Sequence, residues 1–279
     1  MVLATMFFAI MNIMVKYIPG IGAVEIVFFR SIVSFFMSFI VLKARKIPIW
    51  GNNKKWLIIR GLAGSAGLLF FFATIKLMPL GSAIAIQYMS PIFTTLLGVY
   101  FVKERVLPLQ WLFFGLAFAG VIAIQGFDPR VTPFHALLGI AGALSAGMAY
   151  NSIRKLKDSD HPLVIIFYFP MVTIPITGAY LLFNWVTPTL FELGILIGIG
   201  VATQFAQYFM TRAYQSDTLS KISSIQYIGI IFALGAGYML FDESYDFSSS
   251  LGIVVIVLAV ILNVWYKNRS ENMEKTQND

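Results

Sequence analysis

Residues 57–77 read LIIRGLAGSAGLLFFFATIKL, a mainly apolar stretch with three glycines and only two charged residues. A helix that crosses a membrane needs about 20 mainly apolar residues, so this stretch predicts one membrane span. Runs of the same kind recur on both sides of it, separated by short polar breaks. We predict ten spans, at residues 2–17, 24–42, 57–77, 81–101, 107–124, 134–153, 163–183, 190–211, 219–241 and 247–266.

The composition agrees with an all-α integral membrane protein. Of the 279 residues, 58% are hydrophobic and 12% are charged, whereas about 25% are charged in a typical soluble domain. The chain has no cysteine, which excludes disulfide bonds and thiolate metal sites. Its two histidines, His135 and His161, both lie beside predicted loops, so we expect no metal or other cofactor. Basic cytoplasmic loops explain the net charge of +7, and we therefore expect a lipid bilayer and no nucleic acid as partner.

The basic residues predict how the chain is oriented. With a cytoplasmic N-terminus, all but four of the 20 Lys and Arg residues fall on inside loops and helix ends. The exceptions are Lys16, Lys76 and Arg130 outside, and Arg30 within a span. Because positive charge gathers on cytoplasmic loops, we expect both termini inside, and the short loops suit a bacterial inner membrane. The first span lacks the basic region and cleavage site of a signal peptide, so we expect it to be retained.

The two halves of the chain resemble each other after a shift of 139 residues. The matched polar pairs, which are scarce in spans, are Asn12 with Asn151, Lys16 with Lys155, Gln87 with Gln226, Tyr88 with Tyr227, and Glu104 with Glu243. This predicts two five-helix repeats, at 1–128 and 134–266, followed by a polar and disordered cytoplasmic tail at 267–279. Because five is odd, the second repeat enters the membrane from the opposite side. Inverted repeats let transporters alternate access by exchanging conformations. A duplicated bundle without transport is the alternative.

Several motifs resemble the EamA-type family of the drug/metabolite transporter superfamily. They are FATIKLMPLGSA at 72–83, QYMSP at 87–91, KER at 103–105, RAY at 212–214 and FDE at 241–243, together with the arginine Arg30. The chain departs from the family's pattern at Ile230, which stands opposite Pro91. The resemblance implies a ten-helix bundle whose central cavity is lined mainly by spans 1, 3, 4, 6, 8 and 9. Family substrates range over amino acids, nucleotide-related compounds, vitamins and other metabolites.

Polar side chains within apolar spans are costly unless they face a cavity or a partner, so they are candidate site residues. Arg30 lies about two turns into its span, where it could bind a substrate carboxylate or phosphate. A structural arginine that caps carbonyls or snorkels outward is the alternative. For the Gln and Tyr pairs the alternative is interhelical hydrogen bonding. The predicted substrate-binding residues are Asn12, Arg30, Gln87, Tyr88, Ser90, Tyr150, Asn151, Gln204, Gln207, Tyr208, Gln226 and Tyr227.

Three further residues are predicted to take part in gating. Pro91 frees a backbone carbonyl and can bend its helix, which suits either a moving gate or a static kink. Lys76 and Arg212 lie at helix ends near opposite membrane faces, where interfacial anchoring is the alternative role.

These features predict a secondary transporter that moves a small organic metabolite by alternating access, as a monomer or homodimer. Arg30, Lys76 and Arg212 make the path net positive, and no acidic residue is predicted deep in a span. We therefore favour an anionic or zwitterionic substrate, such as a carboxylate, an amino acid or a nucleotide-like compound. A lipid flippase or a channel of the same architecture is the alternative. We expect no enzyme, because no paired aspartates, histidine dyad or activated nucleophile falls within a span.

Overall fold

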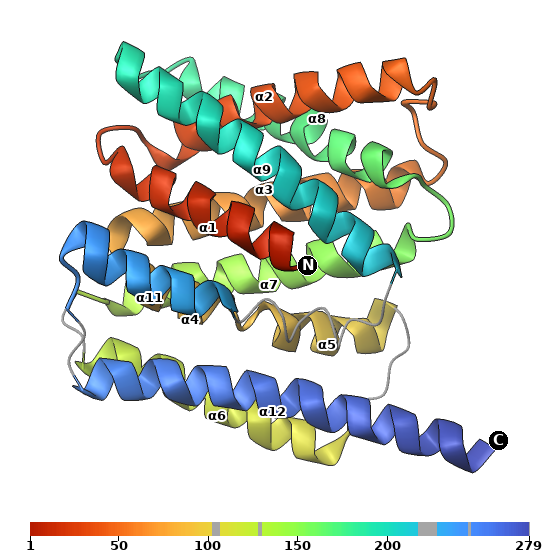
Figure 1. The fold of residues 1–279 in the computed structure, drawn as a ribbon, viewed down its shortest axis with the longest axis vertical. Coiled ribbons are helices and arrows are strands. Elements are labelled where there is room, and N and C mark those ends of the chain that lie inside the picture. The colour runs from red at the N-terminus through yellow and green to blue at the C-terminus, as the bar shows by residue number, and fades with distance from the viewer. Residues whose placement is uncertain (102–106, 128–129, 217–227, 245–246, 279) are drawn as a thin grey trace.

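The computed structural model describes residues 1–101, 107–127, 130–216, 228–244 and 247–278. Within these ranges every regular element is a helix (Figure 1). The helices are α1 (Val2–Tyr17), α2 (Ala23–Ala44), α3 (Lys54–Leu77), α4 (Leu80–Gln87), α5 (Ser90–Phe101), α6 (Pro108–Phe127), α7 (Pro133–Lys155), α8 (Pro162–Leu181), α9 (Leu190–Ser216), α11 (Ile228–Phe241) and α12 (Phe247–Asn278).

The helices are long and apolar enough for a membrane protein. Six described segments could cross a membrane by length and composition, namely α2, α3, the α4–α5 pair, α7, α8 and α9. Shorter apolar helices are found in α1, α6 and α12. Large apolar side chains such as Leu137, Phe191 and Met239 are exposed on the outside of the bundle, as a lipid-facing surface requires. An all-helical membrane protein is therefore confirmed.

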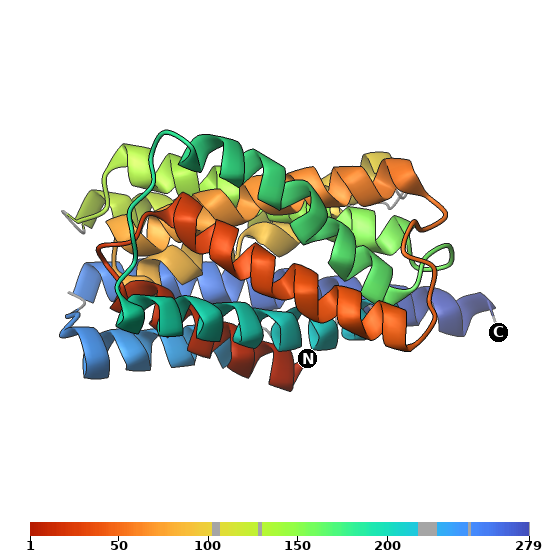
Figure 2. The same ribbon diagram turned by 90° about the horizontal axis from the view of Figure 1, so that it is seen from above.

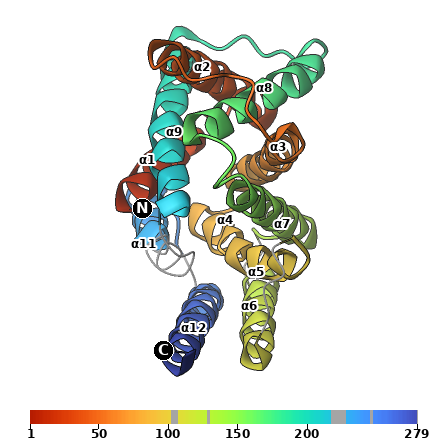
Figure 3. The same cartoon turned by 90° about the vertical axis from the view of Figure 1, so that its right-hand side faces the viewer.

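Helices far apart in the sequence pack side by side. The most extensive contacts join α6 to α12, α3 to α7, α2 to α8 and α1 to α9. Figures 1 and 2 show the helices running roughly along one direction, and Figure 3 looks nearly down them. In that view α2 and α8 lie at one end of the bundle, and α6 and α12 at the other. Small residues permit the closest approaches, because a Cβ at Gly67 would lie 3.1 Å from the backbone nitrogen of Ala146.

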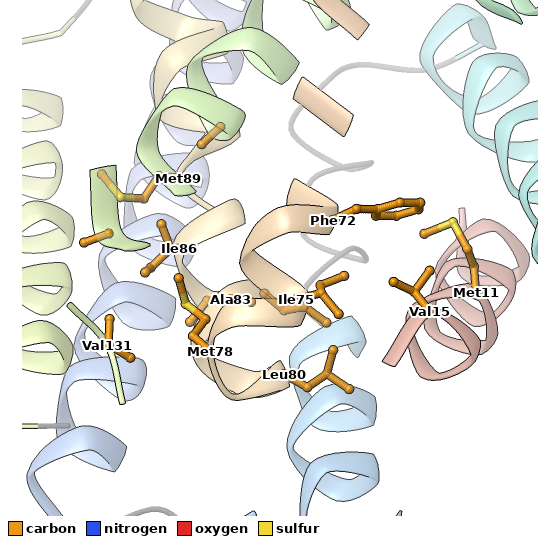
Figure 4. Close-up of a cluster of buried hydrophobic side chains, with 14 of the residues drawn as sticks. Met11, Val15, Phe72, Ile75, Met78, Leu80, Ala83, Ile86, Met89 and Val131 are labelled. Carbon is orange, nitrogen blue, oxygen red and sulfur yellow. The ribbon is translucent and has the colours of Figure 1, made fainter. Parts of the chain in front are cut away.

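An apolar cluster joins the first helices of the chain where α1, α3 and α4 meet (Figure 4). Its buried members include Met11 and Val15 of α1, Phe72 and Ile75 of α3, and Ala83 of α4. This cluster packs the C-terminal ends of α1 and α3 against α4, and so fills one end of the molecule with side chains.

Two expectations about helix bounds need correction. The predicted span 81–101 is not continuous, because α4 ends at Gln87 and α5 begins at Ser90. The predicted disordered tail at 267–279 is helical to Asn278, because α12 continues past the apolar span. Propagating an existing helix is cheap, and the tail contains good helix formers. The first part of the predicted span 219–241, with Gln226 and Tyr227, lies outside the described residues.

Candidate functional site

A cavity of about 160 Å³ lies between the two halves of the chain. Its lining comes from α1, α2, α3, the α4–α5 break, α7, α8, α9 and the start of α11. The predicted substrate-binding residues that line it are Asn12, Arg30, Gln87, Tyr88, Ser90, Tyr150 and Gln207. Along α1 the lining includes Met1 and Thr5 but stops at Asn12, so the cavity occupies only part of the length of that helix.

Two buried arginines meet on one wall of the cavity. Arg30 of α2 is 1% exposed and Arg60 of α3 is 3% exposed. Their guanidinium carbons lie 4.9 Å and 5.2 Å from the ring centroid of Phe169, which belongs to α8. Both cations therefore stack against a single aromatic ring, an arrangement that a desolvated site strengthens.

Neither arginine has a carboxylate partner among the residues that the structure describes. The described part of Arg30 packing leaves its Nε and Nη1 atoms buried without a hydrogen bond, and the same holds for Nε of Arg60. Arg60 Nη2 donates to Gln207 Oε1 at 3.3 Å. A buried charge without a partner is costly, so this wall of the cavity is suited to a ligand that supplies negative charge.

Gly64, one helical turn after Arg60, makes room for the arginine to fold back over its own helix. A Cβ at Gly64 would lie 2.7 Å from the Phe169 ring and closer still to Nη1 of Arg60. Sequence reasoning placed Arg60 among the cytoplasmic helix ends and did not select Gly64 or Phe169. One signal was present, because Arg60 is an unpaired charge inside the predicted span 57–77.

The break between α4 and α5 brings Gln87, Tyr88 and Ser90 to the cavity. Pro91 has no N–H to donate to the carbonyl of Gln87, so the α-helical ladder cannot continue through this point. Met89 N–H instead donates to the Ile86 carbonyl, and Ile92 N–H to the Met89 carbonyl, in shorter-range turns. Gln87 Oε1 is buried without a hydrogen bond in the described structure. Transporters commonly place such discontinuous helices at the substrate site.

The remaining walls of the cavity are largely apolar and aromatic. They include Phe8 of α1, Leu68 and Phe71 of α3, and Met210 of α9. Tyr150 of α7 lies on the same cavity and packs its ring against Tyr214, with the centroids 5.2 Å apart. The site thus combines one cationic wall with surfaces that can contact an organic body.

Three predicted substrate-binding residues do not line the cavity. Asn151 is buried, and its Nδ2 donates to the carbonyls of Thr94 and Gly147, each at 2.9 Å. Gln204 donates to Ser38 Oγ at 2.8 Å between α9 and α2. Tyr208 accepts a hydrogen bond from Arg212 Nη1 at 3.3 Å on the exposed side of α9.

The predicted gating residue Lys76 belongs to a polar cluster beyond the closed end of the cavity. Lys76 Nζ donates to the carbonyl of Ile18, which caps α1, at 2.6 Å. Lys16 Nζ donates to the carbonyl of Met78, which caps α3, at 3.2 Å. Each lysine thus satisfies the C-terminus of the other's helix, where a cation is favoured.

Glu243, which follows α11, completes this cluster. Its carboxylate forms an ion pair with Lys16 and accepts hydrogen bonds from the backbone N–H of Leu80, at 3.1 Å and 2.9 Å. Leu80 is the first residue of α4, so one carboxylate ties together the ends of α1, α4 and α11. Of the other predicted gating residues, Pro91 lies just past the α4–α5 break and Arg212 lies near the end of α9.

A helical bundle with a partly polar cavity between its two halves is the architecture of a membrane transporter. The model of the EamA-like transporter family matches residues 1–125 and again residues 133–265. The chain therefore belongs to the EamA-like transporter family.

Individual relatives are also transporters. A pseudopaline exporter of Pseudomonas aeruginosa (strain UCBPP-PA14) is 31% identical over 263 residues, which cover 93% of each chain. An S-adenosylmethionine uptake transporter of Rickettsia prowazekii (strain Madrid E) is 24% identical over 273 residues, covering 94% of this chain and 90% of that one. A crystal structure with 16% identity shares the fold with a TM-score of 0.66, covering 96% of this chain and 98% of the other. The family and the relatives are named as transporters of small molecules and not as enzymes.

Proposed function

We propose that the chain is a secondary transporter that carries a small organic anion or zwitterion through the central cavity by alternating access. The observation that carries this proposal is the pair of buried arginines, Arg30 and Arg60, on the cavity wall. They are the only charged residues in the described lining, and no described carboxylate pairs with them. A substrate carboxylate or phosphate would neutralise charge that the protein leaves uncompensated.

The proposed architecture is ten spans in two inverted repeats, at 1–128 and 134–266, with 267–279 as a cytoplasmic tail. The family model matches once in each half, which supports a duplication. The helix contacts support it too. Exchanging each helix for its counterpart 139 residues away turns the α3–α7 contact into α1–α9, and the α2–α9 contact into α3–α8. The α2–α8 and α6–α12 contacts each map onto themselves.

Equivalent residues in the two halves have different surroundings, as one state of an alternating transporter requires. Asn151 is locked to Thr94 across the α5–α7 contact, whereas its mate Asn12 lines the cavity with its Oδ1 atom unbonded. We propose that the two sides exchange these roles during transport, so that Asn12 gains the closed contact when Asn151 loses it.

The two ends of α1 differ in the same sense. The cavity reaches Met1, whereas Lys16 at the other end of the helix is tied to Glu243. The bias of Lys and Arg toward the loops on the Met1 side supports cytoplasmic termini. We therefore propose that the structure represents a cytoplasm-facing state closed on the outside by Lys16 and Glu243.

The experiment that tests this function uses the purified full-length protein in detergent. Carboxylates, amino acids, nucleotides and S-adenosylmethionine, the last chosen because Rickettsia relatives are named for its uptake, would be screened for an increase in melting temperature. A stabilising compound would then be followed as a labelled solute in proteoliposomes. We expect saturable flux that Arg30→Gln abolishes.

The same proteoliposomes separate the alternatives. Scrambling of a labelled lipid without metabolite flux would replace this proposal by a lipid flippase. Rapid flux of inorganic ions without saturation would replace it by a channel.

A further inference from the structure

We propose that Arg30 and Arg60 together form a site for a doubly charged anionic group, a phosphate monoester or a pair of carboxylates, carried on an apolar or aromatic body. This inference rests on the proposed function and narrows its substrate class. The site would bind an organic dianion in preference to a singly charged carboxylate of the same size.

The charge of the cavity supports a dianion. Its described lining contains two guanidinium groups and no Asp or Glu. A ligand with one negative charge would leave one buried cation uncompensated in a site of low dielectric, whereas a dianion would neutralise both.

The geometry allows one group to reach both arginines. Because both guanidinium carbons lie over the ring of Phe169, they can be no farther apart than the sum of their distances from its centroid. Guanidinium groups present five donors in a planar fork that matches carboxylate and phosphate oxygens. Arg30 makes no hydrogen bond in the described structure, and Arg60 makes one, to Gln207. Most of the donors of both arginines therefore remain available for a ligand.

A purely structural role for Arg30 does not fit these contacts. Within the described residues Arg30 caps no carbonyl, and with 1% exposure its head group does not reach outward to the membrane surface. Its surroundings are Phe169, Arg60 and the cavity. A second cation beside it raises the cost of leaving it unpaired.

The other walls indicate what carries the charged group. Leu68 and Phe71 line the cavity from α3, and Tyr88 and Tyr150 line it from α4–α5 and α7. These surfaces suit a hydrocarbon or aromatic body, since apolar burial there contributes affinity. Inorganic phosphate would leave them uncovered, so the inference concerns an organic dianion.

Two matched pairs of probes test this inference on the full-length protein in detergent at pH 8. Phenyl phosphate is a dianion at this pH, because the second pKa of a phosphate monoester is about 6, and methyl phenyl phosphate is its monoanionic counterpart. Phenylsuccinate and its monoamide form the dicarboxylate pair. Dissociation constants would be measured by calorimetry, with Arg30→Gln, Arg60→Gln and Arg60→Lys beside the wild type. Arg45→Gln, which removes an exposed charge at the end of α2, is the matched control.

We expect at least one dianion to bind about tenfold or more tightly than its monoanion, because one charge-assisted hydrogen bond is worth roughly that factor. Each Arg→Gln change should reduce this preference to about threefold or less, whereas Arg45→Gln should preserve it. Arg60→Lys should retain part of it, and this variant keeps the test valid if a glutamine variant fails to fold. For the phosphate pair the preference should also disappear at pH 5, where the monoester holds a second proton.

Equal affinities within both pairs, no binding of any of the four probes, or a preference that survives in both Arg→Gln variants would overturn the inference. If a neutral, zwitterionic or singly charged metabolite from the screen is nevertheless transported, the proposed function stands without it. If no compound in the screen binds or is transported, the proposed function itself fails.

Discussion

Arg30 lies over the ring of Phe169, with 4.9 Å between the guanidinium carbon and the ring centroid, and a shift of 139 residues places one residue on the other. The two repeats thus carry an arginine and a phenylalanine at equivalent positions, which face each other across the α2–α8 contact. That contact maps onto itself when the halves are exchanged. A site at this place would stay between the halves in either conformation, as alternating access requires.

Replacing Phe169 tests whether its ring holds the two arginines. Phe169→Leu removes the aromatic face, and each desolvated cation–π contact contributes up to about 2 kcal/mol. We expect roughly tenfold weaker binding of phenyl phosphate with an unchanged fold by circular dichroism. Phe169→Tyr keeps the face and should bind nearly as well as wild type. Equal weakening by both variants would show that the ring's packing, and not its face, matters.

Gly64→Ala should displace Arg60 from the cavity wall. The added Cβ would overlap the tip of the arginine, which can move only by leaving the Phe169 ring. We expect weaker ligand-induced stabilisation, measured as the shift in melting temperature. Gly115→Ala is the matched control, because a Cβ there meets nothing within 4 Å. It should leave binding unchanged and raise stability by up to about 1 kcal/mol through helix propensity.

The Glu243 carboxylate should matter both as a charge and as a cap for α4. Glu243→Ala removes the ion pair with Lys16 and the acceptor for Leu80 N–H, whereas Glu243→Gln keeps an acceptor oxygen. We expect the alanine variant to be less stable than the glutamine variant by about 1–3 kcal/mol, seen in thermal unfolding. Exchanging the charges in Lys16→Glu with Glu243→Lys should not restore stability, because lysine cannot accept from Leu80. Full recovery in that double variant would argue against the capping role.

His161, the N-cap of α8, should make stability fall in weak acid. Burial, together with the nearby positive charges of Arg45 and Arg212, lowers the pKa of His161 below its ordinary value of 6.5. Its Nδ1 also accepts a hydrogen bond from Leu163 N–H at 3.2 Å, which protonation would remove. Because the unfolded chain binds this proton more readily, the stability contributed by neutral His161 is present above pH 6.5 and is lost as pH falls below it.

The measurement compares melting temperatures of wild type and His161→Asn at pH 7.5 and 5.5. Asparagine caps a helix without titrating in this range, so the variant should lose less stability on acidification. Equal losses would assign the pH dependence to other groups.

Hydropathy predicted where most helices lie, because length and apolar content determine which segments suit a bilayer. Polar residues inside spans were a useful signal for the cavity, since Asn12, Arg30 and Gln87 all line it. The same signal did not reveal which way a side chain faces. Gln204 and Gln207 lie on one helix and one turn apart, yet the first bonds Ser38 and the second reaches Arg60.

Depth within a helix was also misjudged in one case. Arg60 follows the basic pair Lys54 and Lys55 closely and was grouped with them at the membrane surface. In the structure α3 already begins at Lys54, so Arg60 lies nearly two turns inside the helix and is buried. Pairing between helices far apart in the sequence, which brings Phe169 to Arg60, depends on tertiary packing that local patterns do not contain.

The central claim is that one cavity opens alternately to the two sides of the membrane, and labelling of single cysteines tests it most directly. The chain has no cysteine of its own, so Ala9→Cys in the cavity lining and Trp50→Cys in the exposed α2–α3 loop give unambiguous signals. A membrane-impermeant maleimide would be applied to sealed cells and to inverted vesicles, with Trp50→Cys reporting the cytoplasmic side. Ala9→Cys should react from the cytoplasmic side in an otherwise wild-type chain, and from the outside as well when Glu243→Gln weakens the closed end. Labelling of Ala9→Cys from one side only, with and without Glu243→Gln, would contradict alternating access.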